Sequence, residues 1–437
     1  MSVDDVIGRA EKALLKYPLC DHCLGRLFAK MGRELGNEER GRALKTLLSM
    51  VYDLKLRATS EGGVKGELYT LAKHGGDPLT RLYKRVYGED VAVDKCYICG
   101  GLLSRSLFNE LAERVSSYLR DLDASTFLVG VKLEQSVLEH ELEVARVAGF
   151  DYSESIKNEV KREVGKRVAQ ITGLQPSFTN PDVVAVIHIP SLYVELEVKP
   201  VYLRGYYVKT GRNISHTPWI TRDGARKYPL SIQEFVDSRL RGLFKADAVL
   251  IHAAGREDVD ARMVGTGRPL VIEVVRPRRR KIDLSELNSL LEGGVVTVRL
   301  EGYAQPRDKR VVKENLGKKA KVYKVLVLLG EEVGEDELRQ LEDFFQDRAV
   351  TQRTPTRVLR RKKDIARRRK VYSVKVASAK GRLVEALIYC ESGLYVKELV
   401  HCDNGRTDPC FAGVLGVQAV PLELDVLGFA GRPGLDF

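Results

Sequence analysis

Two cysteine pairs constrain the fold of this chain more than any other feature of its sequence. Cys20 and Cys23 form one Cys-x-x-Cys pair, and Cys96 and Cys99 form a second, each with a glycine close behind it. Such pairs commonly present four thiolates to a tetrahedral Zn²⁺, and four thiolates leave no open coordination position for catalysis. Because the pairs are far apart in the sequence, we expect a structural zinc ion that joins two distant segments. Two unrelated pairs of free thiols are the alternative.

The segments around and after the cysteine pairs have the pattern of an α+β domain. Asn37 as a likely N-cap, with Glu38 and Glu39 in the first turn, predicts a helix over Asn37–Lys55, between the two pairs. Further along, the helical composition of Glu134–Gly173 is flanked by three β-rich segments, Thr126–Leu133, Val183–Ile189 and Leu192–Val198. A strand, two helices and two strands form a compact α+β unit.

The balance of charge indicates a partner that carries phosphate groups. Lys and Arg number 72 against 60 Asp and Glu, which gives a net charge of +12, and an excess of this kind is typical of proteins that bind nucleic acid. A basic protein without such a partner is the alternative. A chain of 437 residues exceeds one ordinary core and predicts two to three domains.

Localisation and redox state are predicted from what the sequence lacks. No apolar run approaches the roughly 18 residues of a membrane helix, and the N-terminal segment has no signal-peptide core, so we expect a cytoplasmic protein. An odd number of cysteines argues against a disulfide framework. The spacing of Cys390, His401, Cys402 and Cys410 fits no common metal site and predicts ordinary buried thiols.

A stretch dense in acids and bases lies between two apolar runs in the second half of the chain. The runs are 248–254 and 270–275, and Arg256, Asp258 and Asp260 stand between them. Two buried strands joined by a charged loop are typical of a catalytic loop on a rigid scaffold. They are equally typical of a solvated turn, and the residues of this stretch alone leave both interpretations open.

A strongly basic segment, Thr351–Lys370, lies beside the predicted strands Val371–Val376 and Leu383–Tyr389. We expect a long arm that projects from a sheet and binds phosphates, each of which adds a salt-dependent increment of affinity. A solvated surface is the alternative. The sequence has no glycine-rich nucleotide loop after a strand, no Walker A loop and no HExxH motif, so it predicts no nucleotide cofactor.

Several of these segments together resemble one enzyme family. Gly255–Asp258 is similar to the G-R-x-D motif that carries the catalytic aspartate of pseudouridine synthases. Gly393–Lys397 resembles a second motif of that superfamily, with Leu394 where threonine is common. Four longer strings, within 255–269, 302–309, 352–358 and 400–409, resemble the archaeal and eukaryotic branch that makes pseudouridine in the TΨC arm of tRNA.

The resemblance implies an α+β protein of two parts. Residues 1–204 would form an accessory RNA-binding domain with the zinc site and a THUMP-like part over about 60–204. The segments that resemble a THUMP domain are Asn180–Asp182 and Tyr206–Arg212. Residues 205–437 would form the catalytic domain, a mixed and mostly antiparallel sheet with flanking helices and the basic arm 351–370. The expected partner is tRNA, with uridines 54 and 55 as targets. The chain is expected to be a monomer that needs structural Zn²⁺ and no organic cofactor.

The resemblance also assigns catalytic roles. Asp258 would be the nucleophile, a carboxylate kept ionised in a closed pocket by a nearby cation. Lys397 is the expected cation, and Arg256 would displace the base or hold its phosphate. Asp260 is the rival nucleophile, because a separation of two residues places both side chains on the same face of an extended segment.

The target uracil must leave the base stack, which costs about a few kcal/mol. An aromatic ring that receives it offsets roughly 1–3 kcal/mol. Tyr323 matches the pocket tyrosine of the family, Tyr395 is expected to line the same pocket, and Leu424 or its neighbour Leu422 is expected under the base. Strand packing is the alternative for both tyrosines. Contacts to RNA are expected from Arg278, Arg279, Arg280, Arg353, Arg357, Arg360 and Arg361.

Two other classes of protein remain as alternatives. A non-catalytic zinc-containing RNA-binding protein would keep the charge, the cysteine pairs and the basic arm, and would make the aspartate loop incidental. A THUMP-bearing methyltransferase or thiolase would require a nucleotide-binding loop, which the sequence lacks.

Overall fold

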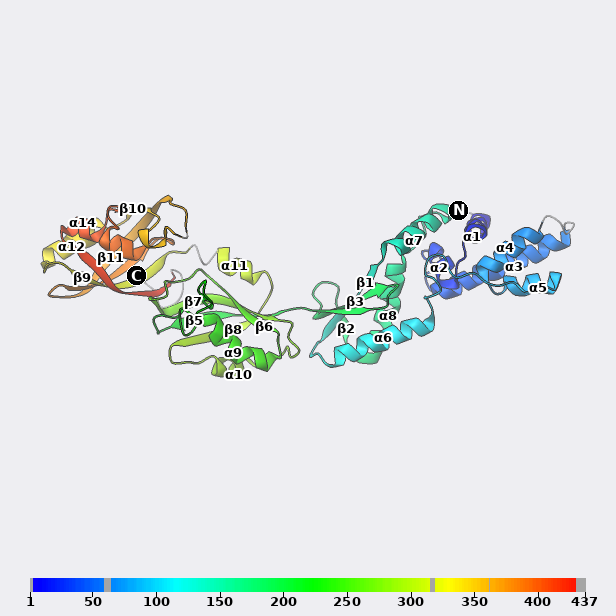
Figure 1. Ribbon diagram of the computed structural model, residues 1–437, viewed down its shortest axis with the longest axis horizontal. Helices are drawn as coiled ribbons and strands as arrows, with labels where there is room; N and C mark the ends of the chain where they lie inside the picture. Colours follow the sequence, from blue (N-terminus) through cyan, green and yellow to red (C-terminus); the bar gives the residue numbers. More distant parts are fainter. Residues whose placement is uncertain (1–2, 59–63, 315–318, 361, 430–437) are drawn as a thin grey trace. The chain divides into compact units, whose positions relative to one another are not determined.

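The computed structural model describes residues 3–58, 64–314, 319–360 and 362–429 (Figure 1). The chain divides into two compact units, Met1–Lys199 and Pro200–Phe437. A boundary between residues 204 and 205 would cut strand β5 (Val201–Lys209), which pairs along its length with two strands of the second unit. The segment Tyr206–Arg212, which resembles a THUMP motif in sequence, therefore belongs to the second unit. No described helix is both long and apolar enough to cross a membrane.

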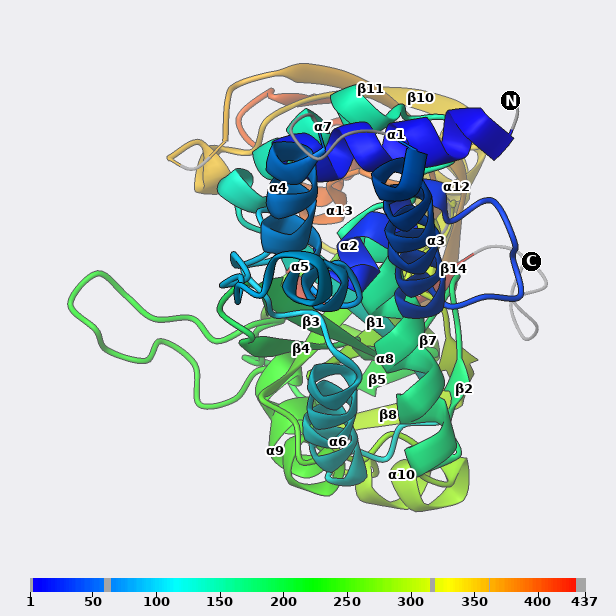
Figure 2. The same cartoon turned by 90° about the vertical axis from the view of Figure 1, so that its right-hand side faces the viewer.

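The first part of unit 1 is helical. Its helices are α1 (Val3–Lys16), α2 (Asp21–Gly25), α3 (Asn37–Ala58), α4 (Lys65–Gly75), α5 (Leu79–Tyr87) and α6 (Arg105–Arg120). Helix α1 lies across the ends of α3 and α4 (Figure 2). The helix predicted over Asn37–Lys55 is confirmed and continues to Ala58.

Helix α2, which carries the first cysteine pair, packs directly against α3. A β-carbon on Gly25 would lie 1.8 Å from the carbonyl oxygen of Asn37, and one on Gly41 would lie 1.9 Å from the carbonyl oxygen of Asp21. Only glycine permits two backbones to approach this closely. The glycine behind Cys23 therefore serves the packing of the two helices.

The rest of unit 1 is the α+β unit predicted from the sequence. A sheet in the order β2-β1-β3-β4 is formed by β1 (Thr126–Leu133), β2 (Gln175–Pro176), β3 (Val183–Ile189) and β4 (Val194–Val198). Two helices, α7 (Gln135–Ala148) and α8 (Ile156–Thr172), follow β1. β1 runs parallel to β3, and β3 runs antiparallel to β4. One hydrophobic core extends from α1 through the cysteine pairs to this sheet.

Unit 2 is built on a ten-stranded sheet. Its strands are β5, β6 (Ala248–Ala253), β7 (Arg262–Val275), β8 (Val296–Ala304), β9 (Lys321–Leu329), β10 (Arg348–Arg353), β11 (Ala366–Lys380), β12 (Leu383–Cys390), β13 (Thr407–Asp408) and β14 (Ala419–Phe429). Its helices are α9 (Ile232–Phe244), α10 (Leu284–Leu290), α11 (Asp308–Glu314), α12 (Glu335–Phe344), α13 (Val396–His401) and α14 (Phe411–Leu415).

The strand order is β13-β10-β11-β12-β9-β14-β7-β5-β8, with β6 paired to β7. Among the described strands of this sheet, only the pairing of β14 with β7 is parallel. The expected mixed, mostly antiparallel sheet with flanking helices is therefore confirmed.

The two largest hydrophobic cores of unit 2 meet at the junction of β7 and β14. Met263 of β7 packs in the core that includes α9, and Ala261, two residues earlier, packs in the core that includes α12. Tyr323 of β9 packs against both cores. At the junction a β-carbon on Gly265 would lie 2.1 Å from the carbonyl oxygen of Leu427. The loop 254–261, which joins β6 to β7, therefore ends where the two cores meet.

The basic segment Thr351–Lys370 consists of two strand ends and the connection between them. Its two ends, Thr351–Arg353 and Ala366–Lys370, belong to β10 and β11, which pair antiparallel from Arg348↔Val371 to Arg353↔Ala366. The connection 354–365 is also anchored, because the Thr356 amide donates to Asp403 Oδ2 at 2.8 Å. The positive charge of the segment gave no sign that its ends form strands. Cations on the exposed face of a strand raise the net charge of a segment without preventing the strand from pairing.

The prediction of free thiols at Cys402 and Cys410 is wrong, because these residues form a disulfide. Cys390 is a free and buried thiol, as expected. The odd number of cysteines argued only against a framework of many bridges, and it says nothing about one local pair. The chain between the two cysteines turns back on itself, with the Thr407 amide donating to the carbonyl oxygen of Cys402 at 3.0 Å.

Candidate functional site

A cleft of about 870 Å³ in unit 2 collects the residues that the sequence singled out as catalytic. Its walls come from loop 254–261, from β9, from the connection after β10 and from the start of α13. The candidate residues lining it are Arg256, Asp258, Tyr323, Tyr395, Lys397 and Leu424. Segments far apart in the sequence therefore converge on one hollow.

Two acids and two cations face one another in this cleft. Arg357 Nη2 lies 3.0 Å from Asp258 Oδ2, and Lys397 Nζ lies 3.8 Å from the same oxygen. Lys397 makes its closest ion pair, at 2.6 Å, with Asp260 Oδ2. Arg256 is exposed and forms no ion pair among the described residues. Arg357 is thus the nearest cation to Asp258, and Lys397 is the nearest to Asp260.

The charges of this group are held in place by their neighbours. Burial alone would raise the pKa of Asp260, but the hydrogen bond and charge of Lys397 outweigh it, so the pKa lies below its usual range. Burial alone would lower the pKa of Arg357, but the carboxylates of Glu398 and Asp258 raise it. Arg357 is therefore a permanent cation, and Asp260 is ionised at neutral pH.

Glu257, which had no role in the sequence interpretation, anchors loop 254–261 through a buried side chain. Its side chain is 3% exposed, and its carboxylate lies 2.9 Å from Arg268 Nε and 3.4 Å from Lys209 Nζ. The Tyr207 hydroxyl donates to it at 2.7 Å. Burial raises the pKa of Glu257, but the charges of Arg268 and Lys209 lower it further, so the group is ionised. The sequence did hold a signal for this role. Successive side chains of an extended loop point to opposite faces, so residue 257 points away from the face of residues 256 and 258.

Three residues predicted to receive a base line the cleft. Tyr323 and Tyr395 both line the cleft, and burial raises the pKa of Tyr323. The Tyr395 hydroxyl accepts from Arg367 at 3.3 Å. Leu424 lines the cleft and is 8% exposed, whereas Leu422 is 50% exposed and is not part of its lining. Of the two leucines considered, Leu424 alone lines the cleft.

Arg212 is a second residue that the sequence interpretation missed. Its guanidinium donates to the carbonyl oxygens of Asp260 at 2.8 Å and Leu424 at 3.1 Å, and to the carboxylate of Asp425 at 3.0 Å. It thereby ties the candidate catalytic loop to β14 across the junction of the two cores. No local pattern marks this role, because its partners are far away in the sequence.

The arginines predicted to contact RNA do not gather in one place. Arg357 alone of them lines the cleft. The backbone amides of Arg278 and Arg279 donate to Phe244 at the end of α9, and Arg280 is buried. Arg353 pairs with Asp364 at 2.8 Å, Arg360 is exposed, and Arg361 lies outside the described residues.

Lys321, two residues before Tyr323, provides a pH-dependent test of the cleft. Burial, followed by the charge of Arg268, lowers the pKa of Lys321 to about 8, against about 10.4 in an unfolded chain. Between these two pH values the folded state binds fewer protons than the unfolded state, so the free energy of unfolding rises with pH across this window. We expect this contribution to reach about 3 kcal/mol.

The measurement is urea denaturation of the wild type and of Lys321→Met from pH 7 to pH 10. The variant lacks the titrating amine, so the stability of the wild type relative to it should increase as pH rises through 8. Lys324→Met is the matched control, because Lys324 lies on the same strand in a half-exposed ion pair with Glu385. Parallel pH profiles for the wild type and Lys321→Met would contradict the assignment.

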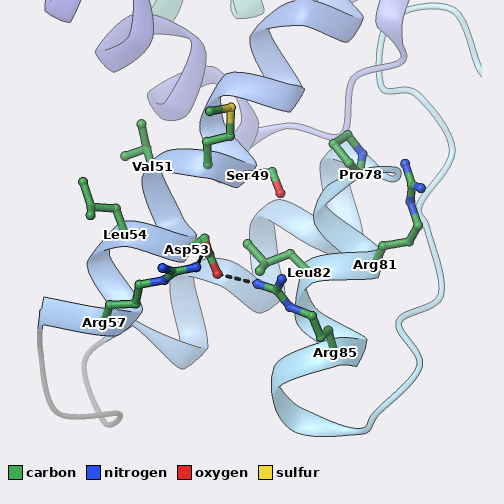
Figure 3. A pocket seen from close by; sticks show the side chains of 10 residues that line it. Ser49, Val51, Asp53, Leu54, Arg57, Pro78, Arg81, Leu82 and Arg85 are labelled. Carbon is green, nitrogen blue, oxygen red and sulfur yellow. Dashed lines mark hydrogen bonds and ion pairs between the residues drawn. The ribbon is translucent and has the colours of Figure 1, made fainter.

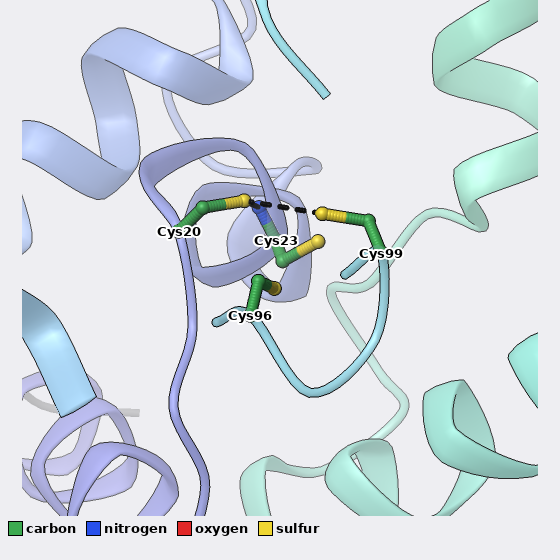
Figure 4. Close-up of side chains that lie close together, drawn as sticks. All are labelled: Cys20, Cys23, Cys96 and Cys99. Carbon is green, nitrogen blue, oxygen red and sulfur yellow. Dashed lines mark hydrogen bonds between the residues drawn. The ribbon is translucent and has the colours of Figure 1, made fainter. Parts of the chain in front are cut away.

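The four cysteines of the two pairs meet in unit 1 (Figure 4). Their sulfur atoms all lie within 4.8 Å of one another, and Cys20 Sγ is 3.6 Å from Cys99 Sγ. His22, between the first two cysteines in sequence, hydrogen-bonds to Glu159 at 2.8 Å instead of joining them. Four mostly buried thiols at these separations match the donor set and the closed geometry of a structural metal site.

A second hollow, of about 660 Å³, lies between α3 and α5 of unit 1 (Figure 3). Met50 and Leu54 give it an apolar side. The arginines at its rim are engaged locally, since Arg57 pairs with Asp53 at 2.8 Å and Arg85 pairs with the same carboxylate. Asp53 is the only carboxylate among the residues that line this hollow, and it is paired with these arginines. The cleft of unit 2 is therefore the candidate active site.

Comparison with known proteins gives matches in both units. The family described as "Pus10, C-terminal" matches residues 202–429, and the family described as "Pus10 THUMP domain, archaeal" matches residues 111–188. The second match is narrower than the THUMP-like span expected over about 60–204.

Full-length relatives are also found. A protein of Thermosphaera aggregans named tRNA pseudouridine synthase Pus10 is 48% identical and covers 98% of this chain and 97% of its own length. One of the same name from Ignisphaera aggregans is 38% identical, with coverages of 98% and 99%. A chain of the solved structure entitled "Crystal Structure of a Cbf5-Nop10-Gar1 Complex" matches 51% of this chain and 48% of its own at 22% identity, with a TM-score of 0.29, a likeness too weak to support a conclusion.

Proposed function

This chain belongs to the Pus10 family of tRNA pseudouridine synthases, and we propose that it isomerises uridine in the TΨC loop of tRNA with Asp258 as nucleophile. The proposed targets are position 54, position 55 or both. The enzyme is an isomerase, so the non-catalytic RNA-binding protein considered from the sequence is no longer a viable alternative.

The observation that supports this proposal best is the ionic environment of Asp258. Its carboxylate has two cations within 4 Å, those of Arg357 and Lys397, and it stands on a loop anchored from below by Glu257. Isomerisation of uridine breaks the bond between N1 and C1′, turns the base, and joins C5 to C1′. A nucleophilic carboxylate assists such a reaction through a covalent intermediate. The product has the same atoms as the substrate, so no organic cofactor is required.

The cleft has the size and lining that a flipped nucleotide needs. A volume of about 870 Å³ with two tyrosines and Leu424 in its walls suits a base taken out of its stack, because aromatic contact offsets the unstacking cost. Tyr323 is the candidate for the ring that receives the base, since it joins both hydrophobic cores and is held firmly.

Asp260 is the weaker candidate for the nucleophile. Its side chain is 60% exposed against 39% for Asp258. A nucleophile that must exclude water from its reaction is better placed at the more enclosed position. We propose that Asp260 holds Lys397 at the edge of the cleft.

For unit 1 we propose a structural Zn²⁺ held by Cys20, Cys23, Cys96 and Cys99 and a role in binding the body of the tRNA. The donor set of four thiolates favours Zn²⁺ among the common structural metals. When bound, the ion would link α2 to the segment before α6. The family match over residues 111–188, described as a THUMP domain, supports the RNA-binding role.

Position mapping tests the proposed substrate. An unmodified tRNA transcript is incubated with the enzyme, and pseudouridine is located by carbodiimide-dependent stops of reverse transcription. We expect a stop in the TΨC loop, and transcripts with cytidine at position 54 or at position 55 separate the two targets. Stops confined to another arm of the tRNA would refute the assigned position and leave the isomerase activity intact.

A further inference from the structure

The charged group nearest to Asp258 comes from a segment outside the two short motifs Gly255–Asp258 and Gly393–Lys397. Arg357 Nη2 forms an ion pair with Asp258 at 3.0 Å, whereas Lys397 Nζ is 3.8 Å away and donates its hydrogen bond to Asp260 at 2.6 Å. The contact to the proposed nucleophile is therefore made by a guanidinium. Lys397, which the family motif led us to expect in that place, is shared between the two acids.

A buried carboxylate fixes that guanidinium. Glu398 Oε1 accepts from Arg357 Nε at 2.7 Å, and the Glu398 side chain is 2% exposed. Its second oxygen, Oε2, has no hydrogen-bond partner among the residues that the structure describes. A carboxylate buried in this way is stable only with a cation beside it. Arg357 and Glu398 thus hold one another, and Nη2 of Arg357 remains directed at Asp258.

The backbone that carries Arg357 is tied to the start of α13, which carries Lys397 and Glu398. The buried side chain of Gln352 donates to the carbonyl oxygen of Tyr395 at 2.9 Å and accepts from the amide of Tyr395 at 2.8 Å. These two bonds keep β10 and the start of α13 in one arrangement. Arg357 therefore has a defined place in the cleft, which an arginine on a free arm would lack.

We infer that Arg357, held by Glu398, is a positioning residue that aims the Asp258 carboxylate at the flipped nucleotide. This inference rests on the proposed nucleophile. A planar guanidinium directs its donors in fixed directions and keeps its charge at all physiological pH values, so it sets the orientation of the carboxylate that it contacts. An ammonium group rotates freely and lacks this control. No bond to Arg357 forms or breaks in the reaction.

The test compares Arg357→Gln with Arg339→Gln in single-turnover assays at saturating enzyme, beside tRNA affinity measured by filter binding. Arg339 is the matched control, an exposed arginine of α12 paired with Glu335. We expect Arg357→Gln to lower the rate constant about 100-fold, the loss that a misplacement near 1 Å produces. The dissociation constant for tRNA should change by less than about threefold. A loss confined to tRNA affinity, or a rate within threefold of the wild type, would overturn the inference.

Chemical rescue separates positioning from mere structural support. Free guanidinium at millimolar concentration should restore part of the rate of Arg357→Ala and none of the rate of Asp258→Asn. Glu398→Gln keeps the shape of the side chain and loses its charge, and we expect a rate loss of about tenfold with unchanged tRNA affinity. If Arg357→Ala recovers nothing, and Glu398→Gln retains the wild-type rate, Arg357 has no positioning role.

A substitute variant and the activity of Asp258→Asn make the test interpretable in every case. Should Arg357→Gln fail to fold by circular dichroism, Arg357→Lys replaces it, because lysine keeps the charge but cannot contact both carboxylates through one rigid fork. Its expected rate loss is about tenfold. An inactive wild type, or an active Asp258→Asn, would refute the proposed nucleophile. An active wild type with inactive Asp258→Asn and fully active Arg357 variants would refute only the inference about Arg357.

Discussion

Asp258→Asn should reduce pseudouridine formation by at least about 10⁴-fold, because the amide cannot act as the nucleophile that the covalent step requires. The amide has nearly the shape of the carboxylate and can still accept a hydrogen bond from Arg357, so the fold should persist. The loop is also anchored independently through Glu257, Arg268 and Lys209. Single-turnover assays on an unmodified tRNA transcript measure the rate, and filter binding measures the affinity for tRNA.

Asp260→Asn is the comparison that decides between the two acids of the loop. It removes the charge that holds Lys397 at 2.6 Å and leaves the pair between Asp258 and Arg357 in place. We therefore expect a loss of about tenfold, far smaller than that of Asp258→Asn. The reverse order of effects, with Asp260→Asn inactive and Asp258→Asn active, would move the nucleophile to Asp260.

Cys96→Ser should remove the bound metal and unfold the helical part of unit 1. Apparent binding free energies of structural zinc sites are about 10–16 kcal/mol, which is as large as the roughly 5–15 kcal/mol that stabilises a whole domain. The cysteine pairs lie within the single hydrophobic core of unit 1, so the loss should spread to α2 and α3. Metal analysis, thermal denaturation and hydrogen exchange of α2 and α3 measure the effect.

Cys390→Ser is the matched control for the metal prediction. Cys390 is likewise a buried free cysteine, but it lies on β12 of unit 2. It should leave the metal content at one equivalent per chain, the stoichiometry of a four-thiolate site. An unchanged metal content in Cys96→Ser, or an equal loss in Cys390→Ser, would rule out the four-cysteine site.

Unit 1 was predictable from the sequence because its signals are local. The N-cap signal at Asn37 and the acids after it located α3 to within a few residues, and β-rich segments located β1, β3 and β4. The spacing of the cysteine pairs even predicted a long-range contact, since a metal requires its four ligands to meet wherever they stand in the chain. Such a requirement is chemical and therefore readable from residue types.

In unit 2 the sequence was a poorer guide to the shape of its basic segment and to the state of its cysteines. The charge of Thr351–Lys370 indicated RNA contact but concealed the pairing of β10 with β11. The count of cysteines concealed the bridge between Cys402 and Cys410. In both cases a property of composition, the charge of a segment or the number of cysteines, was used to predict a contact. Contacts depend instead on which segments the fold brings together.

Taken alone, the sequence determined the α+β class, the two Cys-x-x-Cys pairs and the motifs that place Asp258 and Lys397 in one family of enzymes. Only the tertiary structure decided which cation faces which acid, with Arg357 beside Asp258 and Lys397 beside Asp260. The physical reason is the narrow range of distance over which a hydrogen bond forms, about 2.7–3.2 Å between donor and acceptor. A difference of less than 1 Å between 3.0 and 3.8 Å selects the partner of Asp258, and that distance is set by packing between segments that no local pattern connects.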